Sequence, residues 1–222
     1  MTFSVFPTDG LFDPETEVWN LRGRVIGGGI SVGGSTTLTR TDGGGLWVCQ
    51  MTGIELYTKA QLLAASALDM QLEGGSSSIV VPCFSFPLRP VPAGVDWTPS
   101  IALTDAADLR ATTLSLVITT GAPLVGGEPF SITGEVHGKR FYKVHSVDAA
   151  GVVDGVTTQT IRIRPPLREA AADGVALDFH DVGCVMRLAN PEAWLSPLDA
   201  AHEQVAQPVW IEHFDRPGEE GA

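Results

Sequence analysis

Basic residues are scarce in this sequence, in which 14 Lys and Arg stand against 26 Asp and Glu and leave a net charge of -12. A chain of this charge repels phosphate backbones and anionic lipid headgroups at long range. The composition therefore argues against nucleic-acid binding and against attachment to a membrane surface.

A long hydrophobic run is also missing. The longest apolar stretch, residues 79–88, is interrupted by Pro82, Ser85 and Pro87, and it falls far short of the ~20 residues that span a bilayer. The opening MTFSVFPTDG lacks the basic start and apolar run of a signal peptide. We expect no membrane insertion and synthesis in the cytosol.

Cysteine is too sparse to form a disulfide framework. Cys49, Cys83 and Cys184 are widely spaced, form no CxxC pair and are odd in number. We expect each of them to be a small buried hydrophobic residue.

Glycine, by contrast, is abundant, with 25 residues that cluster in short runs and supply positive φ between strands. Between these runs, several segments alternate apolar and polar residues with the period of two that is typical of half-buried strands. The segments are 19–25, 113–119, 160–164, 175–179 and 184–188. This pattern predicts an all-β fold, a β-barrel or β-sandwich.

One segment, Lys59 to Glu73, is predicted to be a helix of substantial length. Its apolar residues Leu62, Leu63, Ala67 and Met70 recur at helical spacing. Thr58 followed three residues later by Gln61 is a capping-box pattern, and Gly74 stands where a left-handed C-cap is expected. We expect this helix to pack across a sheet.

A proline-rich stretch, Pro82 to Pro99, contains five prolines and cannot hold a central strand, because proline lacks the N–H that a sheet needs. It predicts a connector with a boundary near residue 100. Residues 1–100 would then form an N-terminal β-rich region with the helix, and residues 101–222 a C-terminal barrel-like region. A single domain remains the alternative.

Residues Gly29 to Gly33 match the G-x-S-x-G pattern of a hydrolase nucleophile elbow, with Ser31 as the nucleophile. An elbow needs a helix directly after the serine. Residues 34–39 are poor helix formers and favour another strand. A hairpin is therefore the preferred interpretation, and a small serine hydrolase using Ser31 is kept as an alternative.

Signals for metals and cofactors are weak. His180 and Asp181, with Cys184, supply metal-ligand atoms at short spacing, but strong zinc signals pair two such clusters. No glycine run has the GxGxxG spacing or is followed by GK[ST], as nucleotide-binding loops require. We expect no enzymatic activity, no metal site and no cofactor.

Six of the 14 basic residues are concentrated in one part of the chain. They are Lys139, Arg140, Lys143, Arg162, Arg164 and Arg168. An ordinary solvated strand face explains such a cluster. The alternative is a contact for an acidic patch on a neighbouring copy, because opposite potentials steer and register subunits.

Three segments, GEPFSI at 127–132, GKRFYKV at 138–144 and IRIRPPLR at 161–168, resemble successive barrel strands in tail proteins of long-tailed phages. Residues 68–75, followed by 79–82, are similar to a helix-then-strand pattern of phage distal tail, or tail-tip hub, proteins. The residues that carry the barrel motif, and that the resemblance connects with assembly, are Phe130, Ile132, Arg140, Tyr142, Arg162, Arg164, Pro166, Leu167 and Arg168.

The resemblance implies a structural protein of the virion, made in the host cytoplasm. It would form a ring, usually a homohexamer, that joins the tail tube to the tail tip or receptor-binding apparatus, with other tail proteins as partners. A second alternative, besides the hydrolase, is a glycan-binding module that uses exposed aromatic residues such as Trp97, Trp194 or Trp210.

Overall fold

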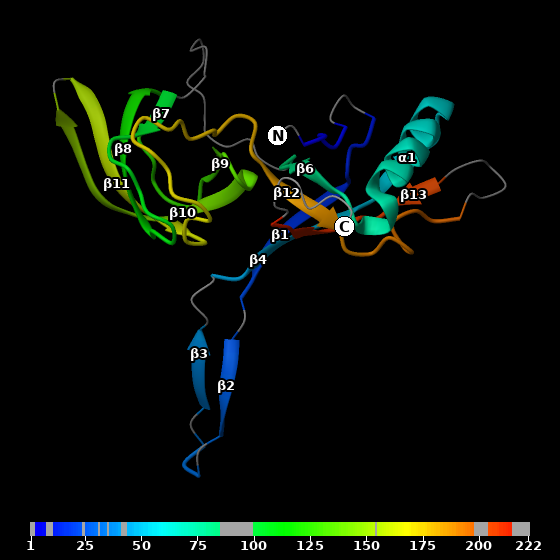
Figure 1. Cartoon of the computed structure of the whole chain (residues 1–222), viewed down its shortest axis with the longest axis horizontal. Coiled ribbons are helices and arrows are strands. Elements are labelled where there is room, and N and C mark those ends of the chain that lie inside the picture. Colours follow the sequence, from blue (N-terminus) through cyan, green and yellow to red (C-terminus); the bar gives the residue numbers. More distant parts are fainter. Residues whose placement is uncertain are drawn as a thin grey trace.

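The structure, a computed structural model, describes residues 3–7, 11–23, 25–30, 32–34, 36–40, 44–84, 100–153, 155–197 and 204–214. Strands dominate these residues, and a single α-helix stands among them (Figure 1). The predicted fold class, all-β with one main helix, is confirmed.

The first sheet has five antiparallel strands in the order β1-β4-β14-β12-β6. Their bounds are β1 Thr16–Arg22, β4 Leu46–Thr52, β6 Ser78–Pro82, β12 Gly183–Leu188 and β14 Val209–Glu212. A small separate sheet pairs β5 (Ile54–Leu56) with β13 (Gln204–Ala206). The first sheet thus takes strands from both sides of residue 100, where the sequence predicted a boundary. Residues 85–99 of the proline-rich stretch lie outside the described residues.

Helix α1, Lys59–Leu72, begins at the predicted residue and packs on the core of the first sheet. Thr58 Oγ1 accepts the N–H of Gln61 at 3.2 Å, and Gln61 Oε1 accepts the N–H of Thr58 at 3.0 Å, so the predicted capping box is present. The left-handed turn begins one residue earlier than predicted, at Glu73 with φ 48, and continues at Gly74 with φ 66 inside the short 3-10 turn η1, Glu73–Gly75.

The side of α1 that faces the core is formed by Ala65, Leu68 and Leu72. Leu63 and Met70, two of the residues whose spacing predicted the helix, are instead 60% and 76% exposed. Because this helix carries apolar residues on more than one side, its sequence gives no clear amphipathic signal for the side that packs.

The second sheet has five antiparallel strands in the order β7-β8-β11-β10-β9. Their bounds are β7 Ser100–Leu103, β8 Thr113–Thr120, β9 Pro129–Gly134, β10 Gly138–Val153 and β11 Val156–Arg164. Ile161 and Ile163 of β11 are buried in the core of this sheet and Arg162 and Arg164 are exposed, as the alternation predicted.

Residues 175–179, predicted as a strand, make isolated bridges instead. Ala176 bridges to Ala102 of β7, and Asp178 bridges to Ser131 of β9. Because β7 and β9 are the two edge strands of the second sheet, this segment crosses between the edges and closes the sheet into a small barrel. The predicted alternation still holds at Leu177 and Phe179, which are both buried.

Strand β10 contributes to both hydrophobic cores. Tyr142 lies in the core of the barrel, whereas its neighbour Phe141 lies in the core of the first sheet. Phe141 stacks on Trp19 of β1 with ring centroids 4.5 Å apart, and its carbonyl accepts the indole N–H of Trp47 at 2.8 Å. The alternation of side chains along one strand therefore ties the barrel to the first sheet.

A two-stranded arm extends from the end of the first sheet, formed by β2 (Val25–Ile30) and β3 (Thr36–Arg40). In Figure 1 this arm points away from both sheets. Within the described part of the chain its strands pair only with each other.

Candidate functional site

The most unusual group in the structure is a buried charged cluster of Arg140, Arg168 and Glu212. Glu212 ends β14, where the burial pattern alternates and Trp210 and Glu212 both point inward. Arg140 belongs to β10, and Arg168 follows β11. The side chain of Arg140 is 2% exposed, that of Arg168 is 8% exposed and that of Glu212 is 0% exposed. The cluster is therefore shielded from water at the junction of the barrel and the first sheet.

Glu212 is held by donors from three segments. Arg168 donates Nε to Oε1 at 3.1 Å and Nη2 to Oε2 at 2.8 Å. The N–H of Trp47 reaches Oε2 at 3.1 Å, and Arg140 Nη1 lies 3.8 Å from Oε1. Because its donors come from three segments, this carboxylate is held in one position and links β14 to the barrel.

Arg140 is less completely satisfied. Its Nη1 donates to the carbonyl of His213 at 2.7 Å, and the ring of Phe214 lies 4.3 Å from its guanidinium carbon. Its Nε and Nη2 are buried without a hydrogen-bond partner. The aromatic face supplies part of the compensation through a cation–π contact.

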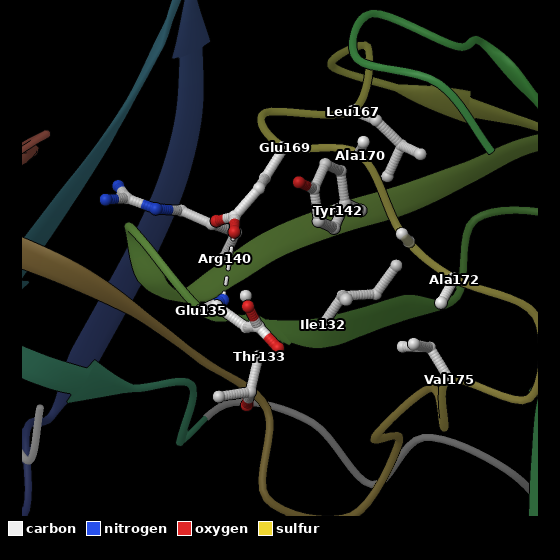
Figure 2. A pocket seen from close by; sticks show the side chains of 12 residues that line it. Ile132, Thr133, Glu135, Arg140, Tyr142, Leu167, Glu169, Ala170, Ala172 and Val175 are labelled. Atoms are coloured by element: carbon white, nitrogen blue, oxygen red, sulfur yellow. Dashed lines mark hydrogen bonds between the residues drawn. The ribbon is translucent and has the colours of Figure 1, made fainter. Parts of the chain in front are cut away.

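A cavity of about 260 Å³ lies next to this cluster, between β9, β10 and the segment 167–175 (Figure 2). Its walls are mainly apolar and are formed by Ile132, Tyr142, Leu167, Ala170, Ala171, Ala172 and Val175, with polar contributions from Thr133, Glu135 and Glu169. Figure 2 shows that the guanidinium of Arg140 points away from the cavity, so only the stem of that side chain contributes to the wall.

Two polar groups at the cavity, the Glu169 carboxylate and the Tyr142 hydroxyl, are already engaged in the fold. Glu169 accepts the backbone N–H groups of residues 135, 136 and 137 at 2.9, 3.0 and 3.2 Å and so holds the β9–β10 turn. The Tyr142 hydroxyl accepts the N–H of Arg168 at 3.0 Å, and burial raises the pKa of this tyrosine above its ordinary value. These groups position the backbone and are poor candidates for general acid or base catalysis.

The structure separates the nine residues of the suspected phage motif into three groups. Phe130, Ile132, Tyr142, Pro166 and Leu167 are buried, four of them in the core of the barrel. Arg140 and Arg168 belong to the charged cluster, and Arg162 and Arg164 are exposed on β11. Four of the nine motif residues thus build the barrel core, and of the nine only Arg162 and Arg164 are exposed to another molecule.

The basic residues of the segment 139–168 do not form one continuous surface. Lys139 pairs with Asp178 at 3.1 Å and with Asp181 at 2.7 Å, and Arg162 Nε pairs with Asp148 at 2.6 Å. This ion pair lowers the pKa of Asp148. Lys143 and Arg164 lie directly opposite each other on β10 and β11.

Two of the three aromatic residues considered for glycan binding, Trp194 and Trp210, are buried and not available for that role. Trp194 and Trp210 are 2% and 0% exposed, so the expectation that they are exposed is wrong. Both belong to the core of the first sheet, because tryptophan offers the largest apolar surface for burial. Trp97 lies outside the described residues.

Ser31, the alternative nucleophile, also lies outside the described residues. The segment after it forms strand β3, which pairs antiparallel with β2, whereas a nucleophile elbow requires a helix there. His180 is exposed, and Asp181 pairs with Lys139. In the part of the chain that the structure describes, no three His, Cys, Asp or Glu residues are placed to hold a metal ion, and no helix is long and apolar enough to cross a membrane.

Sequence reasoning overlooked Glu212, the centre of the charged cluster. The available signal was its position in the short strand VWIE, where alternation puts it on the same side as Trp210. A carboxylate at an inward position predicts a buried cationic partner, but not which of the 14 basic residues supplies it.

Comparison with known proteins gives no relative of this chain: no model of a known protein family matches it, and no curated protein matches it.

Proposed function

We propose that this chain is a structural protein that assembles into a closed ring at the tail tip of a long-tailed phage. The ring would join the tail tube to the tip or receptor-binding apparatus, and the protein would be made in the host cytoplasm and then reside in the virion. No catalytic role is part of this proposal.

The observation that carries the proposal is the β2–β3 arm. An isolated two-stranded hairpin is only marginally stable in water, and its open edges are templates for pairing. The arm nevertheless stands off the body with no third strand among the described residues (Figure 1). A projecting arm of this kind is well suited to bind a neighbouring copy, and head-to-tail contacts between identical copies generate rings when the rotation closes.

Two further features support a structural role. The charged cluster and the Phe141 contacts tie the barrel to the first sheet, as an assembly unit that carries load requires. Four of the nine motif residues that resemble phage tail proteins lie in the barrel core, which is where a family pattern of structural origin is expected. The glycan-binding alternative loses two of its three candidate residues to the core.

Analytical ultracentrifugation and negative-stain electron microscopy of the purified chain test the proposal. We expect a single closed oligomer with a central opening. A variant in which residues 25–40 are replaced by Asn-Gly should be a monomer, with the circular dichroism spectrum and melting temperature of the body retained. A wild-type protein that stays monomeric at high concentration, or that forms open fibres, contradicts the ring.

A further inference from the structure

On the outer side of the barrel two cations face each other, and neither has an ion-pair partner in the described part of the chain. Lys143 of β10 and Arg164 of β11 are direct neighbours in the antiparallel register, and we call them the cation pair. Like charges directly opposite each other in a sheet are destabilising. Within the described residues, the ion pairs involve Lys139, Arg140, Arg162 and Arg168, and neither member of the cation pair takes part in one.

The contrast with Arg162 is informative, because it lies two residues from Arg164 on the same face of β11. Arg162 has its own carboxylate, Asp148, at 2.6 Å. The chain thus neutralises one arginine of this face and leaves the next one, Arg164, beside a lysine. In a protein with 26 acidic and 14 basic residues, an unrelieved pair of cations is not explained by a shortage of carboxylates.

The surroundings hold the lysine in place. Lys143 Nζ lies 5.7 Å from the ring centroid of Trp47 and 5.9 Å from that of Phe141. Trp19 in turn stacks on Phe141, which helps to fix the position of that ring. Because cation–π contacts restrict the rotamers of the lysine side chain, its positive charge is held at a defined position on the surface.

The cation pair also lies beside the base of the arm. Gly44 precedes β4, where the chain returns from the arm, and a Cβ at this position would collide with Pro166 Cδ and would lie 3.2 Å from Pro165 Cβ. Pro165 and Pro166 directly follow Arg164. The base of the arm therefore packs against the two prolines that directly follow Arg164.

We propose that the cation pair is a docking surface for an acidic surface on a second copy of this chain. The inference rests on the ring proposed above and names one of its contacts. Each copy carries a net charge of -12, so a second copy supplies carboxylates, and the cation pair provides the opposite potential that registers them.

This proposal predicts that one substitution weakens assembly and leaves the monomer folded. Lys143→Glu removes a cation from the contact, and within the monomer it exchanges the cation–π contacts of Lys143 for an attraction between the new carboxylate and Arg164. The monomer should therefore stay folded, while self-association should weaken by about tenfold or more, as loss of a close charge pair at an interface does. A residue with only a structural role would not separate these two readouts.

The matched control is Arg187→Glu, which changes the net charge by the same amount on an exposed site of β12 in the first sheet. Sedimentation velocity of the wild type, K143E and R187E at low and high salt, beside thermal melts of each, forms the experiment. K143Q serves as a milder variant if K143E fails to fold. We expect weakened assembly for K143E and K143Q, unchanged assembly for R187E, and weaker wild-type assembly at high salt because screening grows.

The outcomes separate the two proposals. If the wild type assembles and the K143E variant assembles equally well, the docking surface is overturned and the ring proposal stands. Equal weakening by R187E also overturns it, because the effect then follows net charge alone. A monomeric wild type overturns the ring and the docking surface together, and heparin binding by that monomer that K143E abolishes would assign the cation pair to an anionic polymer.

Discussion

Arg168 and Glu212 form a two-point hydrogen bond in the interior, with Nε to Oε1 at 3.1 Å and Nη2 to Oε2 at 2.8 Å. The two residues are 44 positions apart in the chain and belong to the segment after β11 and to β14. Their contact therefore joins the barrel to the first sheet at a point that water does not reach.

Glu212→Gln should destabilise the fold by about 3–5 kcal/mol, because it leaves the buried guanidinium groups without their counter-charge. Equilibrium unfolding in urea measures the change. Asp148→Asn is the control: it removes the exposed partner of Arg162, and exposed ion pairs contribute little. If both variants have the unfolding free energy of the wild type, the buried Arg168–Glu212 pair does not stabilise the fold.

Ile161→Ala should cost about 2–5 kcal/mol through lost burial and a residual cavity, because Ile161 is fully buried in the barrel core. Thermal and urea unfolding report the loss. Thr119→Ala, on an exposed site of the neighbouring strand β8, should change stability far less. Similar effects of the two substitutions would show that β11 does not turn Ile161 inward.

The orientation of α1 can be tested with two leucines of the same helix. Leu68 is 5% exposed, whereas Leu63 is 60% exposed. Leu68→Ala should therefore cost about 2–5 kcal/mol, and Leu63→Ala should leave the unfolding free energy of the isolated chain nearly unchanged. The reverse order would mean that the helix packs on the side of Leu63 and Met70.

Thiol reactivity should distinguish the three cysteines. Burial raises the pKa of Cys184 to about 12 and that of Cys49 further still. At pH 8 the thiolate fraction of Cys184 is then about one in ten thousand, and both thiols are shielded. Native protein at pH 8 should show at most one thiol, the partly exposed Cys83, reacting quickly with a disulfide reagent, and all three should react in denaturant. Fast reaction of two or three thiols in the native state contradicts this burial.

Features that depend on neighbouring residues could be predicted from the sequence. The capping box needs only Thr58 and Gln61, which are three residues apart, so the start of α1 was predicted correctly. The orientation of Ile161 and Arg162 follows from the period of two along any strand, so it was also predicted correctly. Even the segment 175–179, which is not a regular strand, keeps the predicted burial of Leu177 and Phe179.

Tertiary structure alone decided which of these local pieces meet. Alternation puts Trp210 and Glu212 on one side of β14, but only the folded chain brings Arg168 to Glu212 and buries Trp210 in the core of the first sheet. The pairing of Lys143 with Arg164 likewise depends on the register of β10 and β11, which includes two irregularities that no local pattern specifies. The sequence thus determined the fold class and the facing of single side chains, because these follow from backbone periodicity and from contacts within one turn. The charged cluster, the closed barrel and the cation pair arise from contacts between distant segments, whose free energy depends on the packing of the whole molecule.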